Sequence, residues 1–486
     1  MLINLRLISA CIPFFCLLTP AMPQSPVLDL TFGELTGSLN SGAVSLDQVR
    51  RAGMEVFTRP VTTVQGYGDG PFEPSELSPI VPGNRPTLQG NGTSLRVNGL
   101  DAQSCNECHT IVSHDTMPPR LGIGGVGGLA QNAFIGPTQI DVSDGWHSTS
   151  GRDGIADFNG RFSNPPFLFG GGGVELLAKE MTEDLQDLLK QARAASPGTI
   201  TPLGTKGVYF GFLRTVETGV VSLDHVDGIG FNDNADKTAE EVLVVRPFGR
   251  KGENFSMRDF DRGAMAFHFG IQPTEVVGRD SDADGDGIAN EMSEAAMTAL
   301  HIFDVTNPPP MMETMEHEAE AGFRIFQRIA CSGCHRPVMA TRSRYLPLAH
   351  PEVPHDPSAN LYALIDLVDV GFSPAPTGGV YVPLFADLKR HAMGPGLAED
   401  SLHDHIPNDE FTTARLWGVR DTAPYLHDGR ALDIRSAIVA HGGEAQKARD
   451  RFLGLEQEDQ ARLIHFLRGL RTPDEPNREL VELVAE

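Results

Sequence analysis

The chain has 486 residues, of which 21% are charged and 7% aromatic, and its net charge is −25 at pH 7. This acidic excess argues against nucleic acid or anionic lipid as a partner, because both attract basic surfaces. The length suffices for two or three hydrophobic cores, and no apolar stretch beyond the N-terminal segment is long enough to span a bilayer.

Residues 1–23 have the pattern of a secretory signal peptide. One basic residue, Arg6, precedes an apolar run to Leu18, and small and proline residues follow. We therefore expect an exported, periplasmic protein with no transmembrane segment after signal removal. The residues before Cys11 loosely resemble a lipoprotein cleavage site, but the preceding apolar region is very short, so lipid anchoring is the weaker alternative.

The cysteines carry the strongest chemical signal. Of the six, two lie in the signal peptide and four form two C-x-x-C-H motifs, CNECH at 105–109 and CSGCH at 331–335. In this motif two thiols bind haem covalently and the adjacent histidine ligates its iron. A disulfide within each pair, or one zinc ion shared by all four thiols, would leave both histidines unexplained. The sequence thus predicts two covalent c-type haems, one at Cys105, Cys108 and His109 and one at Cys331, Cys334 and His335.

The predicted fold is mainly helical, with two cytochrome c-like haem domains and long loops. The first domain is expected over 24–279, with a glycine-rich insertion at about 110–240. The second is expected over 292–475, and 476–486 form a tail. Strand-like segments are few.

One helix, over 174–195 in the insertion, is predicted from apolar residues that recur with the helical period. A second is expected over 316–330, directly before CSGCH, and a last one over 458–470, which resembles the closing helix of cytochrome c folds. The glycine runs at 122–128 and 169–175 lack the Lys-Ser/Thr ending of a phosphate-binding loop. We interpret these runs as tight turns near cofactor or packing surfaces.

Residues 280–291, DSDADGDGIANE, form a linker with the spacing of a calcium loop. Counted from Asp280, acidic residues occupy positions one, three, five and twelve, and glycine occupies position six. Closely spaced carboxylates repel one another unless a cation or open water screens them. The isoleucine expected at position eight comes one residue late, so an exposed turn that caps the next helix is the alternative. The candidate calcium ligands are Asp280, Asp282, Asp284, Asp286 and Glu291.

Residues 411–445 contain ARLWGV, APYLHDG and HGGEA, and LKRHAMGPGL precedes them at 388–397. These motifs, in this order, resemble the di-haem oxidoreductase family, which is related to bacterial di-haem cytochrome c peroxidases. The resemblance covers about 240–472, the first CxxCH motif and the segment RFSNPPFLFGGGGVELL. It implies one haem that transfers electrons and one that reacts with peroxide.

The resemblance also implies roles for single residues. In the peroxidases, a methionine fourteen residues after the HDG histidine completes the electron-transfer haem, and that position counted from His427 is His441. His441 is thus the expected sixth ligand of the second haem, and Met393 is the rival. Histidine in place of methionine would lower the potential of that haem. His427 is expected to brace a loop or a haem propionate between the domains, with direct catalysis as the alternative.

Peroxide cleavage needs a base at the open face of the reactive haem, because a proton must move from one oxygen to the other. Segment 246–273 resembles the family stretch that holds a catalytic glutamate, and alignment places His268 there, as distal base or as iron ligand. Arg250 replaces a tryptophan of that stretch. Trp417 is expected either to relay electrons between the haems or simply to pack. Further candidates, each of which can also be an ordinary loop residue, are His114, Met117, Trp146 and His147.

The leading hypothesis is an exported di-haem c-type oxidoreductase that reduces hydrogen peroxide at the first haem with electrons delivered through the second. The electron donor would be a small protein such as a cytochrome c or a cupredoxin, and the acidic chain suits a basic one. A di-haem oxygenase or protein-modifying oxidase that acts on a small organic substrate or a protein side chain is one alternative, because the insertion could wall a pocket. A non-enzymatic di-haem electron carrier is another.

Overall fold

The computed structural model describes residues 25–68, 103–107, 109, 134–140, 158–165, 168–230, 237–398, 406–474, 476–477 and 480. The signal peptide, Cys108, His114, Met117, Trp146, His147 and the glycine run at 122–128 lie outside the described residues. Within those ranges, no helix has the length and apolar character that crossing a membrane requires.

Helices predominate over strands, as expected. Several begin at a capping box, in which Ser or Thr and a Glu or Gln three residues later satisfy each other's backbone N–H groups; Thr31 with Glu34 is one case. The helices are α1 (Phe32–Ser41), α2 (Leu46–Thr58), α3 (Gly171–Ala194), α4 (Ala239–Val242), α5 (Met257–Ala264), α6 (Thr274–Val277), α7 (Glu294–Val305), α8 (His317–Arg328), α9 (Ile434–Ala440), α10 (Gln446–Leu453) and α11 (Gln457–Arg468). Shorter turns include the π-helix η7 (Met265–Phe269) and the 3-10 helices η1 (Pro26–Asp29), η2 (Thr63–Gln65), η4 (Cys105–Glu107), η8 (Cys331–Gly333), η9 (Val419–Asp421) and η10 (Gly443–Ala445).

The described strands form small antiparallel sheets. The largest is the three-stranded meander β3 (Ile200–Thr205), β4 (Val208–Glu217) and β5 (Val220–Ser222), which was not predicted from the sequence. Two-stranded pairs are β1 (Phe134–Ile140) with β2 (Phe158–Ser163), β6 (Met311–Met312) with β13 (Leu470–Arg471), β7 (Met339–Ala340) with β10 (Tyr381–Val382), β8 (Tyr345–Ala349) with β9 (Leu361–Asp366), and β11 (Arg390–Ala392) with β12 (Glu410–Thr412).

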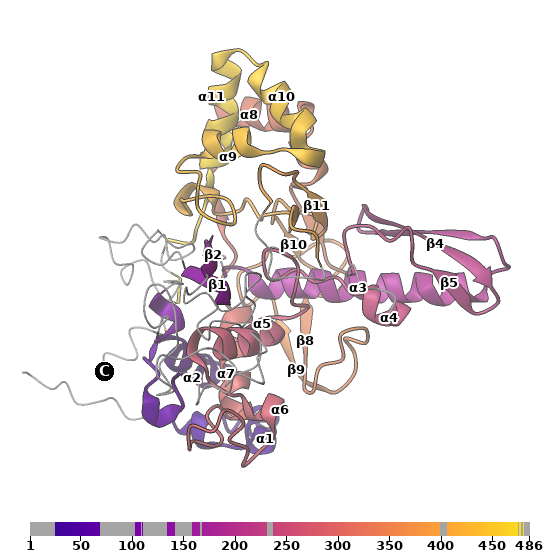
Figure 1. Cartoon of the computed structure of the whole chain (residues 1–486). Helices are drawn as coiled ribbons and strands as arrows, with labels where there is room; N and C mark the ends of the chain where they lie inside the picture. The colour runs from indigo at the N-terminus through magenta and orange to yellow at the C-terminus, as the bar shows by residue number, and fades with distance from the viewer. Residues whose placement is uncertain are drawn as a thin grey trace, which may run out of the picture.

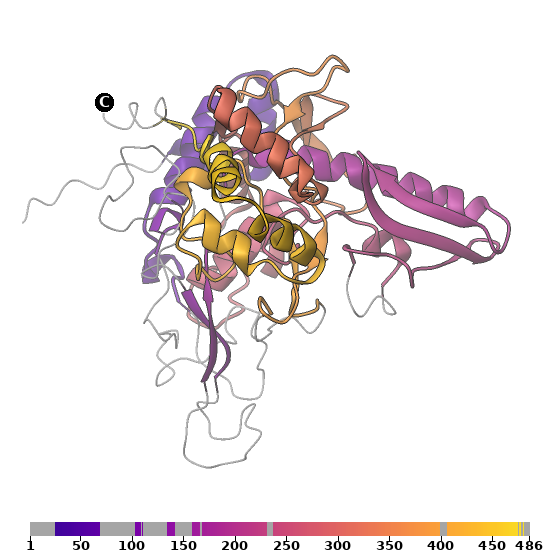
Figure 2. The same cartoon turned by 90° about the horizontal axis from the view of Figure 1, so that it is seen from above.

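The predicted helices are confirmed as α3, α8 and α11, with ends that differ by a few residues. The glycine run at 169–175 includes the first turn of α3, where neighbouring residues pack closely against it. A Cβ on Gly172 would lie 2.3 Å from the carbonyl oxygen of Val305, and one on Gly173 would lie 2.4 Å from the ring of Phe372. In Figures 1 and 2, α3 and the meander project together to one side.

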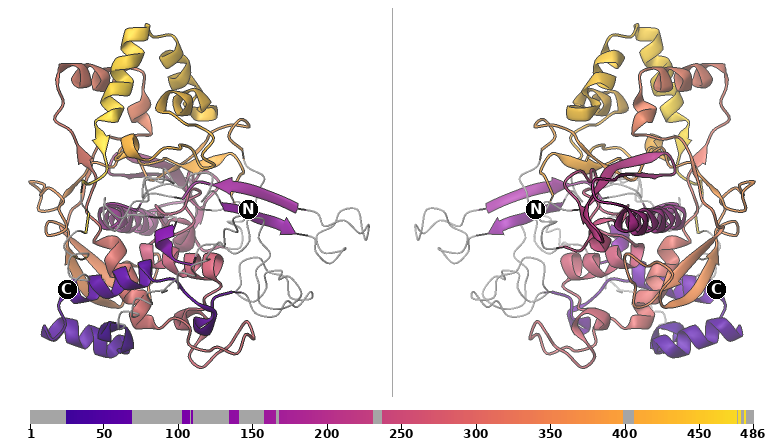
Figure 3. Two further views of the ribbon diagram at one scale, coloured as in Figure 1. Left: turned by 90° about the vertical axis from the view of Figure 1, so that its left-hand side faces the viewer. Right: turned by 90° about the vertical axis from the view of Figure 1, so that its right-hand side faces the viewer.

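Two apolar cores divide the described chain. The larger gathers α2, α3, α7 and the strands β8 and β9, and the smaller gathers α8 to α11. Figures 1 and 3 show the α8–α11 group, mostly yellow, above the rest. The division differs from the expected linker at 280–291, because α7 follows that segment and packs into the larger core.

Each core contains a helix pair that crosses at a glycine. A Cβ on Gly53 of α2 would lie 2.0 Å from the carbonyl oxygen of Ala299 in α7, and a Cβ on Gly322 of α8 would lie 2.0 Å from that of Arg462 in α11. Only glycine allows backbones to approach so closely. The first CxxCH motif follows α2, and the second follows α8 directly.

Candidate functional site

The second CxxCH motif lies at the end of α8, where Ala330 adopts a left-handed conformation (φ 72°) and turns the chain into η8. The backbone N–H of His335 donates to the carbonyl of Cys331 at 3.0 Å. Cys331 and Cys334 form no disulfide, and burial raises the pKa of the Cys331 thiol to about 12.

His335 faces His441, which ends α9. Their ring centroids are 6.3 Å apart and the ring planes make an angle of 55°. The Nδ1 of His335 lies 3.1 Å from the carbonyl oxygen of Phe385, and the Nδ1 of His441 lies 2.8 Å from that of Ala437. A carbonyl can only accept, so both Nδ1 atoms carry hydrogen, and in a neutral ring Nε2 then holds the lone pair that binds a metal.

Burial keeps both rings neutral. It lowers the pKa of His335 to about 4, with a further lowering by His441, and it also lowers the pKa of His441. Two imidazoles on opposite sides of one iron, each nitrogen at about 2 Å with its ring centre about 1.1 Å behind, would have centroids about 6 Å apart. The observed 6.3 Å fits this arrangement. The pair therefore fits a haem iron with two histidine ligands.

Met393, the rival ligand, lies in the neighbouring segment. Its backbone N–H donates to Asp409 at 2.8 Å, and its carbonyl oxygen lies 2.7 Å from where a Cβ of Gly442 would be. Both candidate segments therefore adjoin the same site, but the ring that pairs with His335 is that of His441.

His391, two residues before Met393, was not selected from the sequence. Its ring lies 2.9 Å from carboxylate oxygens of both Asp387 and Glu444. The side chains of Cys334, Asp387 and His391 also lie close enough together to hold a metal ion. Burial lowers the pKa of His391, but hydrogen bonds to Asp387 and Cys334 raise it to about 11, so the ring is a cation. His391 lies in the segment LKRHAMGPGL, within which only Met393 was predicted as a ligand.

The first CxxCH motif repeats the backbone turn of the second. The N–H of His109 donates to the carbonyl of Cys105 at 2.8 Å. The preceding residues are held by the Val61 N–H, which donates to Gln103 at 2.8 Å. Cys105 packs on the larger core and Cys331 on the smaller one. Among the described residues, no cluster of metal-binding side chains joins Cys105 to the second motif.

His268 lies in η7, a π-helix that continues α5 without a break. Gly270 ends it in a left-handed conformation, and the carbonyl of Phe269 accepts from the N–H of Gly68, so the N-terminal segment packs across this end. Single π-helical turns within α-helices are frequent at functional sites, because they displace a side chain from its regular position.

Trp417 is buried, 2% exposed, at the junction of the two cores. It belongs to the larger core, whereas its neighbours Leu416 and Val419 belong to the smaller one. Its indole fills the space that a side chain at Gly170 would need, 2.5 Å from that Cβ position.

His427 stacks on Phe411 with centroids 4.4 Å apart, and its carbonyl accepts from the N–H of Asn164 at 2.8 Å. The Asn164 amide donates to the carbonyls of Pro424 and Leu426. The PYLHDG turn is thus tied to the end of β2, as a bracing role requires.

In the acidic loop, three of the five predicted calcium ligands converge, namely Asp282, Asp284 and Asp286. Asp280 instead accepts a hydrogen bond from the Asn290 amide at 3.0 Å. Asp282 holds the turn, because its carboxylate accepts the N–H groups of Asp286 (3.1 Å) and Gly287 (3.0 Å).

Two carboxylate oxygens in this loop lack a hydrogen-bond partner among the described residues. They are Oδ2 of Asp284, a residue only 6% exposed, and the buried Oε1 of Glu291. Burial raises the pKa of Asp284 to about 6 and that of Glu291 to about 8. Carboxylates desolvated without partners need a cation or a proton.

A comparison with known protein families supports a haem site at the second CxxCH motif. Residues 274–470 match the family described as "Di-haem oxidoreductase, putative peroxidase". The matched region contains CSGCH, His391, His427 and His441 but not the first motif. No curated protein matches significantly.

Among solved structures, the chain is similar to hydrazine synthase of Kuenenia stuttgartiensis pressurised with xenon, at 14% identity and a TM-score of 0.31, over 85% of this chain and 94% of that one. Residues 274–470, less than half of the chain, are thus similar to the di-haem oxidoreductase family, whose name implies haem cofactors and oxidoreductase activity.

Proposed function

We propose that the chain is an exported di-haem c-type oxidoreductase that reduces hydrogen peroxide, with the first CxxCH site as the reactive centre and the second as the site of electron entry. The main support is the facing pair His335 and His441. His335 and His441 would hold the iron of the second haem, and an iron with two histidine ligands would transfer electrons rather than bind substrate. The haems, when bound, supply the redox-active irons.

The two glycine helix crossings support two cytochrome c-like units. In the first unit α2 precedes CNECH and α7 closes the core; in the second α8 precedes CSGCH and α11 closes it. On this proposal the first unit extends to about residue 306, past the boundary expected from the sequence. The acidic loop then lies inside the first unit, between η7 and α7, rather than between domains.

His268 is our candidate acid–base group of the first site. An imidazole can take a proton from one oxygen of the peroxide and return it to the other near neutral pH. His268 lies on a π-helical turn, and the hydrogen bond from Gly68 to Phe269 holds the end of that turn in place. This supports a fixed position for the His268 side chain. If it ligates the first iron instead, the chain would be a di-haem electron carrier, the second candidate function.

Trp417 and His427 would then act where the two units meet. Trp417 is buried where the two cores meet, so it is our candidate electron relay. His427, stacked on Phe411 and tied to Asn164, would hold the PYLHDG turn in place.

Electrons would come from a small, basic cytochrome c or cupredoxin. The net charge of −25 favours a basic partner through long-range attraction. The predicted signal peptide would place this chain in the periplasm, where covalent haem attachment occurs in bacteria, so its donor would have to be periplasmic too.

We also propose a calcium ion in the acidic loop, with Asp282, Asp284, Asp286 and Glu291 as its ligands. The support is the two buried carboxylate oxygens without a partner, which calcium, a hard cation with oxygen ligands, would satisfy. Asp280, the first calcium ligand predicted from the sequence, is not part of this proposed set.

The proposal is tested by the haem content and the EPR spectrum of the oxidised and half-reduced protein. We expect two covalent haems per chain, a low-spin signal from the second site, and a high-spin fraction from the first that disappears on mixing with peroxide. One haem per chain contradicts the di-haem assignment. Two low-spin irons without reaction with peroxide would identify the electron carrier instead.

A further inference from the structure

A cluster of ionisable side chains is buried between α3, α5 and α7, away from both CxxCH motifs in sequence. At its centre Glu175 and His301 are both 0% exposed. One carboxylate oxygen of Glu175 lies 2.7 Å from Lys179 Nζ, and the other lies 3.4 Å from His301 Nε2 and accepts the N–H of Met257 at 2.9 Å. Burial raises the pKa of Glu175, but the charges of Lys179 and His301 lower it further, so the carboxylate is ionised.

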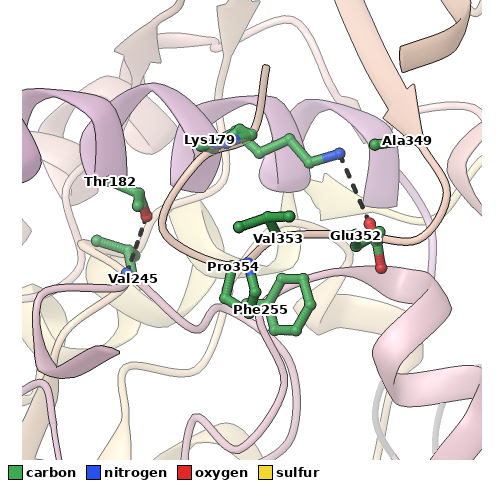
Figure 4. Close-up of a pocket in the computed structure, with 9 residues that line it drawn as sticks. Lys179, Thr182, Val245, Phe255, Ala349, Glu352, Val353 and Pro354 are labelled. Carbon is green, nitrogen blue, oxygen red and sulfur yellow. Dashed lines mark hydrogen bonds and ion pairs between the residues drawn. The ribbon is translucent and has the colours of Figure 1, made fainter. Parts of the chain in front are cut away.

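The cluster reaches a small pocket through Lys179 and Glu352. Lys179 Nζ is 3.9 Å from Glu352 Oε1, and the other oxygen of Glu352 accepts from Ser256 Oγ at 2.6 Å. Figure 4 shows these two side chains pointing toward each other along one edge of the pocket. The pocket has a cavity of about 10 Å³, room for one water, and its wall continues into the exposed residues His355 and Asp356.

The opposite end of the cluster is a carboxyl pair, Asp261 on α5 and Asp304 on α7. Both are nearly fully buried, and the charge of Asp304 opposes ionisation of Asp261. Two neighbouring carboxyl groups in an apolar site do not both ionise, so one keeps a proton. Burial raises the pKa of Asp304 to about 8, and burial together with Asp304 raises that of Asp261. Asp304 lies one helical turn from His301.

Five atoms along this path have no hydrogen-bond partner in the described part of the chain. Glu175 Oε1 and Glu352 Oε1 face only the charge of Lys179 Nζ. The other three are His301 Nδ1, Asp304 Oδ1 and Asp261 Oδ2. Buried polar atoms of native proteins are normally paired, by protein or by ordered water. These open atoms are therefore places where ordered water would bind and bridge neighbouring side chains.

The pair is also connected to the proposed reactive site through the helices that carry it. Asp261 precedes His268 by seven residues on one continuous helix, which is about 10 Å along the axis. Asp304 belongs to α7, the helix that crosses α2 before the first CxxCH motif. The cluster thus links a water-sized cavity near the surface to the helix that carries the candidate acid–base group.

We propose that Glu352, Lys179, Glu175, His301, Asp304 and Asp261 form a proton relay from the pocket to the His268 side of the first site. This rests on the proposed function. Peroxide reduction consumes protons and electrons in equal number, H₂O₂ + 2 H⁺ + 2 e⁻ → 2 H₂O, with the electrons coming from the reduced donor protein. Each relay step moves one proton between neighbouring groups or through a bridging water, and the carboxyl pair stores one proton close to its point of use.

The kinetic test compares two relay variants, Asp304→Asn and Glu352→Gln, with a matched control, Glu180→Gln. Glu180 is equally buried on α3, but its carboxylate binds Lys206 and the N–H groups of Arg342 and Ser343, outside the relay. In the haem-loaded protein we expect each relay variant to slow peroxide turnover by about tenfold, less than the about 10²- to 10⁴-fold of a direct acid–base group. The solvent deuterium isotope effect should rise, and a small permeant weak acid should restore the rate.

The control should keep the wild-type isotope effect even if it is less stable. Equal slowing in Glu180→Gln and Asp304→Asn, with no change of isotope effect in either, would overturn the relay.

A second readout does not depend on turnover. The infrared carbonyl band of a protonated, buried carboxylic acid should shift when the haems are reduced, and the shift should be absent in Asp304→Asn. If the wild type reduces no peroxide, the proposed function fails while the relay is judged on this band alone. A band that is the same in wild type and Asp304→Asn, or that does not respond to reduction, refutes the relay.

Discussion

His335 and His441 face each other across 6.3 Å, and each donates its Nδ1–H to a backbone carbonyl. The first prediction concerns this pair. In the haem-loaded protein, His441→Met should keep the second iron six-coordinate and raise its potential, because thioether favours ferrous iron more than imidazole does. His441→Gly should open the site and produce a high-spin signal.

Met393→Leu is the matched control, since Met393 adjoins the same site without pairing with His335. It should leave the EPR spectrum and the potential of the second haem unchanged. A spectrum that changes in Met393→Leu and not in His441→Gly would reverse the assignment of the ligand.

His268 gives the second prediction. As a distal base, it should be dispensable for the resting spectrum but not for the chemistry, so His268→Ala should slow peroxide cleavage by about 10² to 10⁴. Stopped-flow mixing with peroxide measures this rate. If His268→Ala instead creates a high-spin iron and reacts faster, His268 is a ligand that closes the site.

The sequence predicted the local features well, because they depend on residue type and spacing. The helix α3 follows from its apolar period and the haem motifs from their cysteines. The division of the cores could not be predicted, because it depends on which helices pack together. The backbone contact between Gly53 and Ala299 joins segments almost 250 residues apart and assigns α7 to the first core.

The same limit applies to the site. The pairing of His391 with Asp387 and Glu444 depends on the β11–β12 strand pair and on η10, and no sequence spacing encodes it. The buried cluster around Glu175 was missed for a different reason. On α3 the charged residues Glu175 and Lys179 look like a solvated face, whereas α7 and the segment after β8 cover them.

The third prediction tests the glycine crossings. Gly53→Ala and Gly322→Ala should each destabilise the protein by about 1–3 kcal/mol, because the added methyl meets a backbone carbonyl that cannot move easily. Gly37→Ala in α1 is the control: nothing lies within 4 Å of its Cβ position, so alanine should be neutral or stabilising. Denaturation followed by haem absorbance measures all three. Equal stability of the Gly53 and Gly37 variants would contradict the close crossing.

The fourth prediction concerns pH. The pKa of Asp304 is raised by burial to about 8 in the folded protein, against 3.8 when exposed. Between about pH 4 and pH 8 the folded state therefore keeps a proton that the unfolded state has lost, and the free energy of unfolding should fall as pH rises through this window, by at most about 1.4 kcal/mol per pH unit. The ionisable group that acts directly on Asp304 is Asp261, and Asp261 is in turn affected by the charges of Glu175 and Arg258.

Asp304→Asn mimics the protonated acid and should flatten this pH dependence. The free energy of unfolding of the variant should therefore increase relative to that of the wild type as pH rises. Urea denaturation at pH 5 and pH 8 checks it. Parallel slopes for both proteins would show that Asp304 titrates normally in the folded state.

The last prediction tests whether Asp280 belongs to the calcium ligands of the acidic loop. If calcium binds Asp282, Asp284, Asp286 and Glu291, then Asp282→Asn should lose both the calcium-dependent rise in thermal midpoint and the calcium detected by elemental analysis. Asp280→Asn should retain both, because the Asp280 side chain pairs with Asn290 and not with the other carboxylates. The converse result, with calcium lost only in Asp280→Asn, would restore Asp280 as the ligand predicted from the sequence. A chelator that changes neither the thermal midpoint nor the haem spectrum of the wild type would leave the loop without a bound cation. The comparison is sharp because the two aspartates are two residues apart on one loop and carry the same charge, so a general effect of surface charge would act on both alike.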